Sequence, residues 1–540
     1  SSASPRFECV SRKRDTLLVD ISQVIVRNMV THAEARSCLC VVFETQPVVL
    51  WPYNAAMSGA GDPPTGRYLP QRLLGEGASG RVWLVEDGLR PGSRLALKEL
   101  SATESDDGLR HEESLRREFA TLACLRHPNL VEVHEFDRSP ESGLPRFTLE
   151  FIEGRDVVDA VAHEGPGLWV EMSVEALRAL TFLHDFDLIH GDLKPANLLV
   201  RDRPKLGCRL VVVDFGFART SAEETVEAYR ARGTLPYMAP EVLRSEGAGP
   251  RSDLYALGAV LWEAIFGHPP FRLEGSDLTR FIQAVIEGRR ARPALPDGYP
   301  EGLGPWLEEM LSPDPEARPA TADEALARFN EACGTDHPAE TPASRAARLL
   351  SGPPAEREEA IAQIRDCLEP STVPRLVWLC GEPGSGKTRI LRWLEADGIR
   401  SGWHVVTAGL HDTLSLDELR ATARERPTMV LLDELDAAGA GTVELLDRVA
   451  REPDGPPVQI VAALRPGQIE QPTLRKLYAD TGTVPTLRSV TLDRLGENDL
   501  RAMAARAARG EVSAERVQWL LQASEGSPAV AETLLIEGAW

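Results

Sequence analysis

The strongest signal in this chain is the segment LIHGDLKPANLL at residues 188–199. Within six residues it supplies a carboxylate (Asp192), an ammonium group (Lys194) and a side-chain amide (Asn197). Transfer of a phosphoryl group needs a carboxylate that orients and deprotonates the acceptor hydroxyl, a cation near the transferred phosphate and a metal ligand. The segment therefore predicts a site for phosphoryl transfer.

A further acidic residue follows the next predicted strand. The apolar run at 210–213 ends at Asp214, which opens the sequence Asp-Phe-Gly, and a later Ala-Pro-Glu ends at Glu241. A carboxylate at the end of a buried strand can hold Mg²⁺ together with the amide oxygen of Asn197. The order of these segments along the chain fits a site that uses a nucleotide triphosphate.

Upstream, the glycine-rich segment GEGASGRV at 75–82 lies between two predicted strands, 68–74 and 81–86. A strand on each side favours a hairpin that covers phosphates and disfavours a dinucleotide fold, in which a helix would follow the glycines. Val82 is expected to pack on the adenine ring. The glycines whose missing Cβ lets the backbone approach phosphate oxygens are Gly75, Gly77 and Gly80.

The next predicted strand, 94–99, supplies a cation. Lys98 lies close to Ala96 in this strand and would offset the charge of the α- and β-phosphates. Glu118 lies on the following predicted helix, 115–125, and is placed to fix the lysine by an ion pair. A Lys–Glu ion pair is therefore expected beside the phosphate site.

Together these motifs resemble those of eukaryotic-like protein serine/threonine kinases of bacterial type, over about residues 67–333. The resemblance implies an α+β bilobal kinase fold with ATP and Mg²⁺ in the cleft. Asp192 matches the catalytic base of the family, and Lys194 matches its serine/threonine branch. The residues implied for catalysis are Asp192, Lys194, Lys98 and Glu118, and those implied for Mg²⁺ are Asn197 and Asp214.

The resemblance also implies the remaining contacts of ATP and several supporting residues. Leu149 matches the gatekeeper position, and residues 150–152 match the hinge. The implied nucleotide-binding residues are Leu74, Gly75, Gly77, Gly80, Val82, Ala96, Lys98, Glu150, Ile152 and Leu199. The implied supporting residues are Thr234 on the substrate side, Asp253 under the catalytic loop, and the buried ion pair Glu241–Arg318.

Gly191 departs from the family pattern, which usually has arginine between the histidine and the aspartate. That arginine normally meets a phosphate on the activation loop, so its absence leaves such a phosphate less to bind. We therefore expect activity that does not depend strictly on phosphorylation of Thr220, Ser221 or Thr225.

A second signature, GEPGSGKT at 381–388, follows the apolar run 376–380 and opens an amphipathic helix. In this context the backbone N–H groups at the helix start cradle phosphates. Lys387 would reach the β- and γ-oxygens, and Thr388 would bind Mg²⁺. The glycines of this predicted P-loop are Gly381, Gly384 and Gly386.

Two later strands are predicted to complete the second site. The strand 429–434 ends in Asp433, a candidate Mg²⁺ ligand, and Glu434, a candidate for polarising water. The strand 458–464 is followed by Arg465, placed to sense a γ-phosphate. The alternation of strands and helices after residue 373 predicts a parallel α/β sheet.

With Gly-Ser-Pro at 526–528, these motifs resemble the signal-transduction ATPases with numerous domains (STAND), a branch related to AAA+ proteins, over residues 373–540. This implies an α/β P-loop NTPase domain with a parallel sheet and a C-terminal helical subdomain. The predicted organisation is an N-terminal extension, expected to be poorly ordered, at 1–66, a kinase domain at 67–333, a linker and leading helix at 334–372, and the P-loop domain at 373–540.

Composition limits the functional classes. The net charge of −22 argues against a nucleic-acid or anionic membrane surface as the main partner. Eight cysteines are scattered without a C-x-x-C pair, which favours reduced thiols over a disulfide or zinc framework. No apolar run reaches the roughly 20 residues of a membrane helix. These features predict no membrane partner and a cytoplasmic location.

The leading hypothesis is an ATP- and Mg²⁺-dependent kinase of protein Ser/Thr residues with a regulatory P-loop domain. That domain is a candidate for a second ATPase activity and for homo-oligomer formation. One alternative is a kinase-fold scaffold whose signalling comes from ATP-dependent oligomerisation of the P-loop domain. The other is a motor or DNA-handling ATPase with a kinase appendage, which the acidic composition disfavours.

Overall fold

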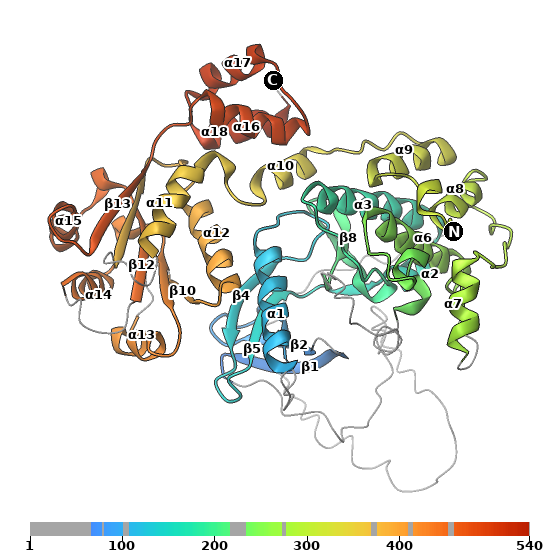
Figure 1. Cartoon of the computed structure of the whole chain (residues 1–540), viewed down its shortest axis with the longest axis horizontal. Helices are drawn as coiled ribbons and strands as arrows, with labels where there is room; N and C mark the ends of the chain where they lie inside the picture. Colours follow the sequence, from blue (N-terminus) through green and yellow to red (C-terminus); the bar gives the residue numbers. More distant parts are fainter. Residues whose placement is uncertain are drawn as a thin grey trace, which may run out of the picture. The chain divides into compact units, whose positions relative to one another are not determined.

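The computed structural model describes residues 66–77, 80–100, 107–215, 234–272, 277–368, 375–408, 414–451 and 458–538 (Figure 1). All of them belong to the unit formed by residues 63–540. The predicted extension at 1–66, except for Gly66, lies outside the described residues, as do Thr220, Ser221 and Thr225. No helix in the described ranges has both the length and the apolar character needed to cross a membrane.

An antiparallel sheet of five strands in the order β1-β2-β3-β5-β4 comes first in the chain. Its β1–β2 hairpin pairs Gly77 with Gly80, as the glycine-rich segment predicts. Helix α1 (Asp107–Ala123) packs on β4 and β5, with Phe119 edge-on to Phe147. The strands are β1 (Tyr68–Gly77), β2 (Gly80–Asp87), β3 (Arg94–Glu99), β4 (Val133–Arg138) and β5 (Pro145–Glu150).

A mainly helical region follows and is built around α6, whose apolar run predicts a buried helix. Leu254, Leu257 and Val260 of α6 are fully buried. Gly258 allows the close approach of α8, because a Cβ there would lie 2.9 Å from Met310 Cβ. The helices are α2 (Val157–Glu164), α3 (Pro166–Asp185), α5 (Pro240–Leu243), α6 (Pro250–Phe266), α7 (Leu278–Ile286), α8 (Leu303–Met310) and α9 (Ala322–Cys333).

A small antiparallel sheet and several 3-10 turns complete this region. The sheet has the order β6-β7-β8, and its strands are β6 (Gly154–Asp156), β7 (Leu198–Lys205) and β8 (Cys208–Val212). The 3-10 turns are η2 (Pro195–Asn197), η3 (Leu235–Tyr237) and η4 (Pro315–Ala317). The turn η2 stands directly before β7, so the sheet fixes one end of the segment at 188–199.

The segment predicted to be a linker contains a helix, α10 (Pro342–Leu350). Thr341 caps it by accepting a hydrogen bond from the Ser344 N–H, and Ala347 and Leu349 are buried. The Thr-Pro pair at 341–342 is a helix-start signal that the Pro- and Ser-rich composition obscured. The turn η5 (Ala355–Arg357) and helix α11 (Glu358–Leu368) follow. Helix α11 lies where the sequence predicts a leading helix.

The C-terminal part contains a wholly parallel sheet in the order β10-β11-β12-β9-β13, which confirms the predicted α/β arrangement. Its strands β10, β12 and β13 are labelled in Figure 1. Residues of alternate parity along the strands pack into two separate apolar clusters, so both faces are covered. The strands are β9 (Leu376–Gly381), β10 (His404–Ala408), β11 (Thr428–Leu432), β12 (Val458–Leu464) and β13 (Leu487–Leu492).

The helices of this part divide into those that cover the sheet and those that follow it. Covering helices are α12 (Lys387–Arg400), α13 (Leu416–Ala423), α14 (Ala440–Arg451) and α15 (Pro472–Ala479), with the turns η6 (Leu435–Ala437) and η7 (Pro466–Gln468). The last three helices are α16 (Glu497–Ala508), α17 (Ala514–Ser524) and α18 (Pro528–Glu537). These three share an apolar cluster with Leu349 of α10.

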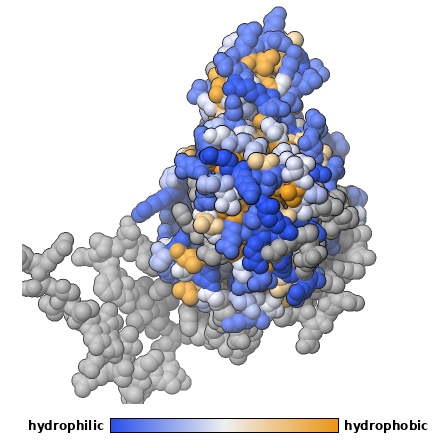
Figure 2. Space-filling model, turned by 90° about the vertical axis from the view of Figure 1, so that its left-hand side faces the viewer, coloured by the Kyte–Doolittle hydropathy of each residue, from blue (hydrophilic) through white to orange (hydrophobic). Residues whose placement is uncertain are grey.

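The face in Figure 2 is mostly hydrophilic, with small separate groups of apolar side chains. In the described residues, the exposed large apolar side chains are scattered along the chain and include Leu69, Leu89, Leu206, Trp519 and Val530. Isolated apolar side chains of this kind are ordinary on a folded surface.

Candidate functional site

The buried helix α6 holds the segment that contains Asp192. Asp253 of α6 is 1% exposed, and its carboxylate accepts hydrogen bonds from the backbone N–H groups of His190 and Gly191, both at 2.9 Å. His184 Nε2 lies 3.0 Å from the same carboxylate. Gly191 has a φ of +73°, which glycine adopts without strain. The backbone directly before Asp192 is therefore held in place by Asp253 of α6.

Asp192 is oriented by three neighbours. Lys194 Nζ donates to Asp192 Oδ2 at 2.7 Å, and Thr234 Oγ1 donates to Asp192 Oδ1 at 2.7 Å. Asn197 Nδ2 donates to the Asp192 carbonyl oxygen at 2.8 Å. The structure thus brings together the carboxylate, the ammonium group, the amide and the threonine that the sequence selects.

Lys98 forms a buried cluster with two carboxylates. Its Nζ lies 2.6 Å from Glu118 Oε1 and 2.7 Å from Asp214 Oδ1. Burial opposes the charged form of Lys98, but Glu118 and Asp214 raise its pKa well above the usual value. The Lys98 ammonium in turn lowers the pKa of Asp214. Asp214 has a φ of +54°, a strained conformation for an aspartate that is common at functional sites.

Asn197 and Asp214 have donor oxygens of the kind that Mg²⁺ prefers. The Val213 N–H donates to the Asn197 carbonyl oxygen at 3.0 Å, which ties the turn η2 to the residue preceding Asp214. Asn197 uses its Nδ2 on Asp192, and Asp214 uses Oδ1 on Lys98. An amide oxygen and a carboxylate oxygen fit Mg²⁺, which protein sites usually hold through few side chains and substrate phosphates.

The residues implied for the base of ATP come from strands of both antiparallel sheets and from the segment after β5. Val82 and Ile152 pack against the same apolar core that contains Ala96, while Leu74 is 37% exposed. Leu199 lies on β7, where it pairs with Val211. These residues are apolar, which is the kind of side chain that mostly lines nucleotide pockets.

Two of the predicted nucleotide residues have structural partners that the sequence did not indicate. The Glu150 carboxylate pairs with Arg201 and with Lys205, which leaves only its backbone for a hinge contact. Gly80 is needed by the sheet, because a Cβ there would lie 2.2 Å from the Glu99 carbonyl oxygen. A Cβ added to Gly75 would meet no atom within 4 Å, so packing within the protein does not require glycine at this position. Gly77 closes the hairpin opposite Gly80.

The ion pair of Glu241 and Arg318 is buried, with Nη1–Oε1 at 2.7 Å and Nη2–Oε2 at 2.8 Å. The Arg318 side chain is fully buried and also lies over the Tyr255 ring at 4.9 Å. Burial acts against the Glu241 carboxylate, but the Arg318 hydrogen bonds lower its pKa. Ser252 Oγ supplies a further hydrogen bond at 2.8 Å.

The second signature forms a loop between β9 and α12. Gly384 and Gly386 have φ values of +75° and +96°, and Gly386 caps the helix that begins at Lys387. Lys387 Nζ donates to the carbonyl oxygens of Gly381 and Glu382 at 2.8 Å. Backbone N–H groups at such a helix start form a ready site for phosphate.

The ends of β11 and β12 lie at the same edge of the sheet as this loop. Thr388 Oγ1 donates to Asp433 Oδ2 at 2.6 Å, so the two predicted Mg²⁺ ligands are together. Glu434 is exposed and has a φ of +50°. Arg465, predicted to sense a γ-phosphate, pairs with Asp436 through Nε at 3.0 Å.

Several residues around this loop carried no local sequence signal. Arg357 of η5 donates to the Ser385 carbonyl oxygen at 3.1 Å, and Arg494 pairs with Glu382 at 3.1 Å. A Cβ on Gly384 would lie 3.0 Å from Ala529 Cβ at the start of α18. These partners are separated by 28 to 145 positions, and only the fold brings them together.

Comparison with known proteins gives matches to the part of the chain that contains the first of these sites. The protein kinase domain family matches residues 68–329. The serine/threonine-protein kinase PknB of Mycolicibacterium smegmatis is 31% identical over 345 residues, 61% of this chain and 52% of the relative. The DNA damage-responsive serine/threonine-protein kinase RqkA of Deinococcus radiodurans is 36% identical over 272 residues, 48% of this chain and 39% of the relative.

PknA of Mycobacterium tuberculosis, a serine/threonine-protein kinase, is 32% identical over 262 residues, 47% of this chain and 58% of the relative. The chain spans about half the length of the curated relatives it matches. The matches support a bacterial-type serine/threonine kinase domain, and kinases of this family use ATP and Mg²⁺. The family match ends before the parallel sheet begins.

Proposed function

We propose that this chain is a protein serine/threonine kinase that transfers the γ-phosphate of ATP to Ser or Thr hydroxyls of protein substrates. The hydroxyl oxygen forms a bond to the γ-phosphorus, the bond to ADP breaks, and Asp192 accepts the hydroxyl proton. Lys194 is placed to offset charge on the transferred group, because its Nζ lies 2.7 Å from Asp192. Asn197 and Asp214 would hold Mg²⁺, which offsets phosphate charge.

The observation that carries this proposal is the Lys98 cluster. Lys98 bonds both Glu118 and Asp214 within a segment that matches the protein kinase family. A purified-protein assay with labelled ATP, followed by mass spectrometry of the modified sites, tests it. Phosphate on Ser or Thr of the chain itself or of an added protein is expected. Nucleotide binding without any transfer would instead favour the scaffold alternative.

The activation loop gives the next prediction. Replacing Thr220, Ser221 and Thr225 together by Ala is expected to keep the transfer rate within about tenfold of the wild type, since Gly191 offers no side chain to a loop phosphate. Initial rates at saturating ATP measure this. A loss of several hundredfold would show that loop phosphorylation is required after all.

We further propose that the parallel sheet with α12 to α18 forms a STAND-like P-loop domain that binds ATP and Mg²⁺ and acts as a regulatory switch. The Lys387 loop, the Thr388–Asp433 contact and the approach of α18 to Gly384 support it. We also propose that this domain hydrolyses ATP, with Glu434 polarising the attacking water. The domain would self-associate, and the protein would be cytoplasmic.

Counting bound nucleotides tests the second site. Lys387→Ala is expected to lower the ATP stoichiometry of the full chain from two to one, because the lysine is the side-chain cation of the loop. Equilibrium dialysis with a non-hydrolysable ATP analogue and Mg²⁺ gives the number directly. The exposed Lys476 of α15 provides a matched Lys→Ala control that should leave it at two. An unchanged stoichiometry in Lys387→Ala would contradict the proposed site.

A further inference from the structure

Helix α12, which begins at the P-loop lysine, packs against helix α1, which carries Glu118. Ile399 near the end of α12 is 3% exposed and belongs to the apolar cluster that contains Phe119, not to the cluster of its own sheet. A Cβ on Gly402 would lie 3.2 Å from Arg116 of α1. One helix of the parallel-sheet region thus completes the core beside α1.

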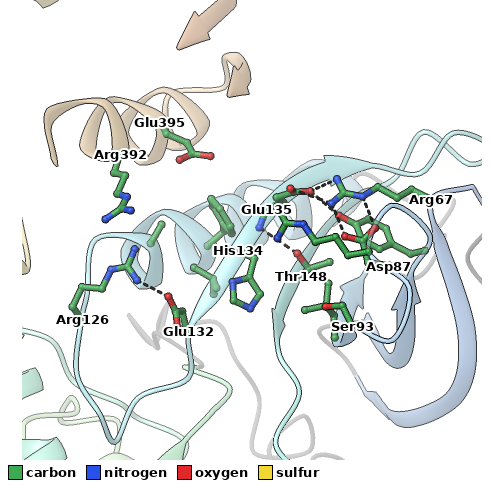
Figure 3. A pocket seen from close by; sticks show the side chains of 16 residues that line it. Arg67, Asp87, Ser93, Arg126, Glu132, His134, Glu135, Thr148, Arg392 and Glu395 are labelled. Carbon is green, nitrogen blue, oxygen red and sulfur yellow. Dashed lines mark hydrogen bonds and ion pairs between the residues drawn. The ribbon is translucent and has the colours of Figure 1, made fainter. Parts of the chain in front are cut away.

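The contact between the two helices is not uniformly packed. Figure 3 shows Arg392 and Glu395 on α12 at the rim of a cavity of about 370 Å³. The same cavity is lined by Phe119 and Ala123 of α1. Ile399 therefore fills one part of the contact, while another part borders a cavity whose remaining lining comes mainly from the five-stranded sheet and its loops.

A second connection joins the end of α1 to the P-loop itself. The Gly352 N–H donates to the Cys124 carbonyl oxygen at 2.8 Å, and the Arg126 N–H donates to Ser351 Oγ at 2.7 Å. Six residues after Ser351, Arg357 donates to the Ser385 carbonyl oxygen within the loop. A short segment therefore contacts both the residues that directly follow α1 and the predicted phosphate site.

We propose that nucleotide at the P-loop site activates the kinase site by bracing α1 through α12 and the segment 351–357. This rests on the proposed P-loop function. In the structure, Glu118 of α1 bonds Lys98 at 2.6 Å. Phosphates bound to the N–H groups at the start of α12 hold that helix and the loop in place. The braced α1 then keeps Glu118 on Lys98.

This regulation requires that α1 has two positions and that nucleotide binds with different affinity in each. A ligand shifts such an equilibrium only by its difference in affinity for the two states. In this proposal nucleotide binds Lys387 and the loop. Arg357 contacts the loop, and Ser351 contacts Arg126, three residues after α1, so the braced position is the one that nucleotide favours. The same coupling predicts that Ser351→Ala and Ile399→Ala weaken the brace without altering either nucleotide site.

The test measures initial rates of protein phosphorylation by the full chain at saturating ATP. Lys387→Ala, Ile399→Ala and Ser351→Ala are each expected to lower the rate at least about fivefold, the lower range of coupling between sites. Leu394→Ala is the matched control, because Leu394 is a buried residue of the same helix that belongs to the cluster of its own sheet, whereas Ile399 belongs to the cluster that contains Phe119. It is expected to keep the wild-type rate.

Hydrogen exchange supplies a readout that does not depend on activity. With an ATP analogue filling all available sites, amides of residues 111–123 in α1 should exchange faster in Lys387→Ala than in the wild type. If stoichiometry falls from two to one while rate and exchange stay unchanged, the brace is refuted and the P-loop function stands. If the wild type binds one nucleotide, the P-loop function fails and this regulation fails with it.

Discussion

Replacing Asp192 by Asn is expected to slow phosphoryl transfer about a thousandfold, the typical contribution of a positioned general base. The amide keeps the size of the side chain but cannot accept the proton of the attacking hydroxyl. Thr234 and Lys194 hold the carboxylate oxygens at 2.7 Å, so the effect should appear in kcat. ATP affinity should change little, because Asp192 is not among the residues assigned to the nucleotide.

The measurement is the initial rate of protein phosphorylation at several ATP concentrations. Asp202→Asn is a matched control, since Asp202 is exposed on β7 and should leave the rate unchanged. Rescue of the slow variant at higher pH would indicate that solvent can take the hydroxyl proton. A fall of less than about tenfold in Asp192→Asn would contradict the role of this carboxylate, because a positioned base contributes more.

The first site was predictable because its chemistry is concentrated in short segments. Asp192, Lys194 and Asn197 lie within six residues, and the turn η2 brings the amide back to the Asp192 carbonyl oxygen. Lys98 and Glu118 are farther apart, but a strand followed by a helix places them together. For this site, the order of the residues along the chain and the family resemblance were enough to predict most of the contacts.

Features that depend on long-range packing were not predictable in this way. Arg465 follows its strand as expected, but the sequence did not indicate that its guanidinium forms an ion pair with Asp436 of the turn η6. Gly80 looks like a phosphate-loop glycine in sequence, while the structure shows that β3 requires it. The contact of Ile399 with the core beside α1 has no sequence signature, because apolar spacing on α12 does not reveal which neighbour covers each face.

Replacing Glu241 by Ala is expected to destabilise the helical region built around α6 by about 3–5 kcal/mol, the usual effect of removing one partner from a buried ion pair. The Arg318 guanidinium, whose side chain is fully buried, would lose both hydrogen bonds to the carboxylate. Its remaining acceptors are the carbonyl oxygens of Ser312 and Arg251. Neutral oxygens cannot balance a buried positive charge.

Urea unfolding of the full chain, followed by the fluorescence of its tryptophans, measures this change. Glu316→Ala is the matched control, because Glu316 pairs with Arg251 at a site where its side chain is 78% exposed. Such exposed pairs contribute less than about 1 kcal/mol, so the control should unfold close to the wild type. Equal effects of the two substitutions would mean that water reaches Arg318 and that its burial does not govern the stability of this region.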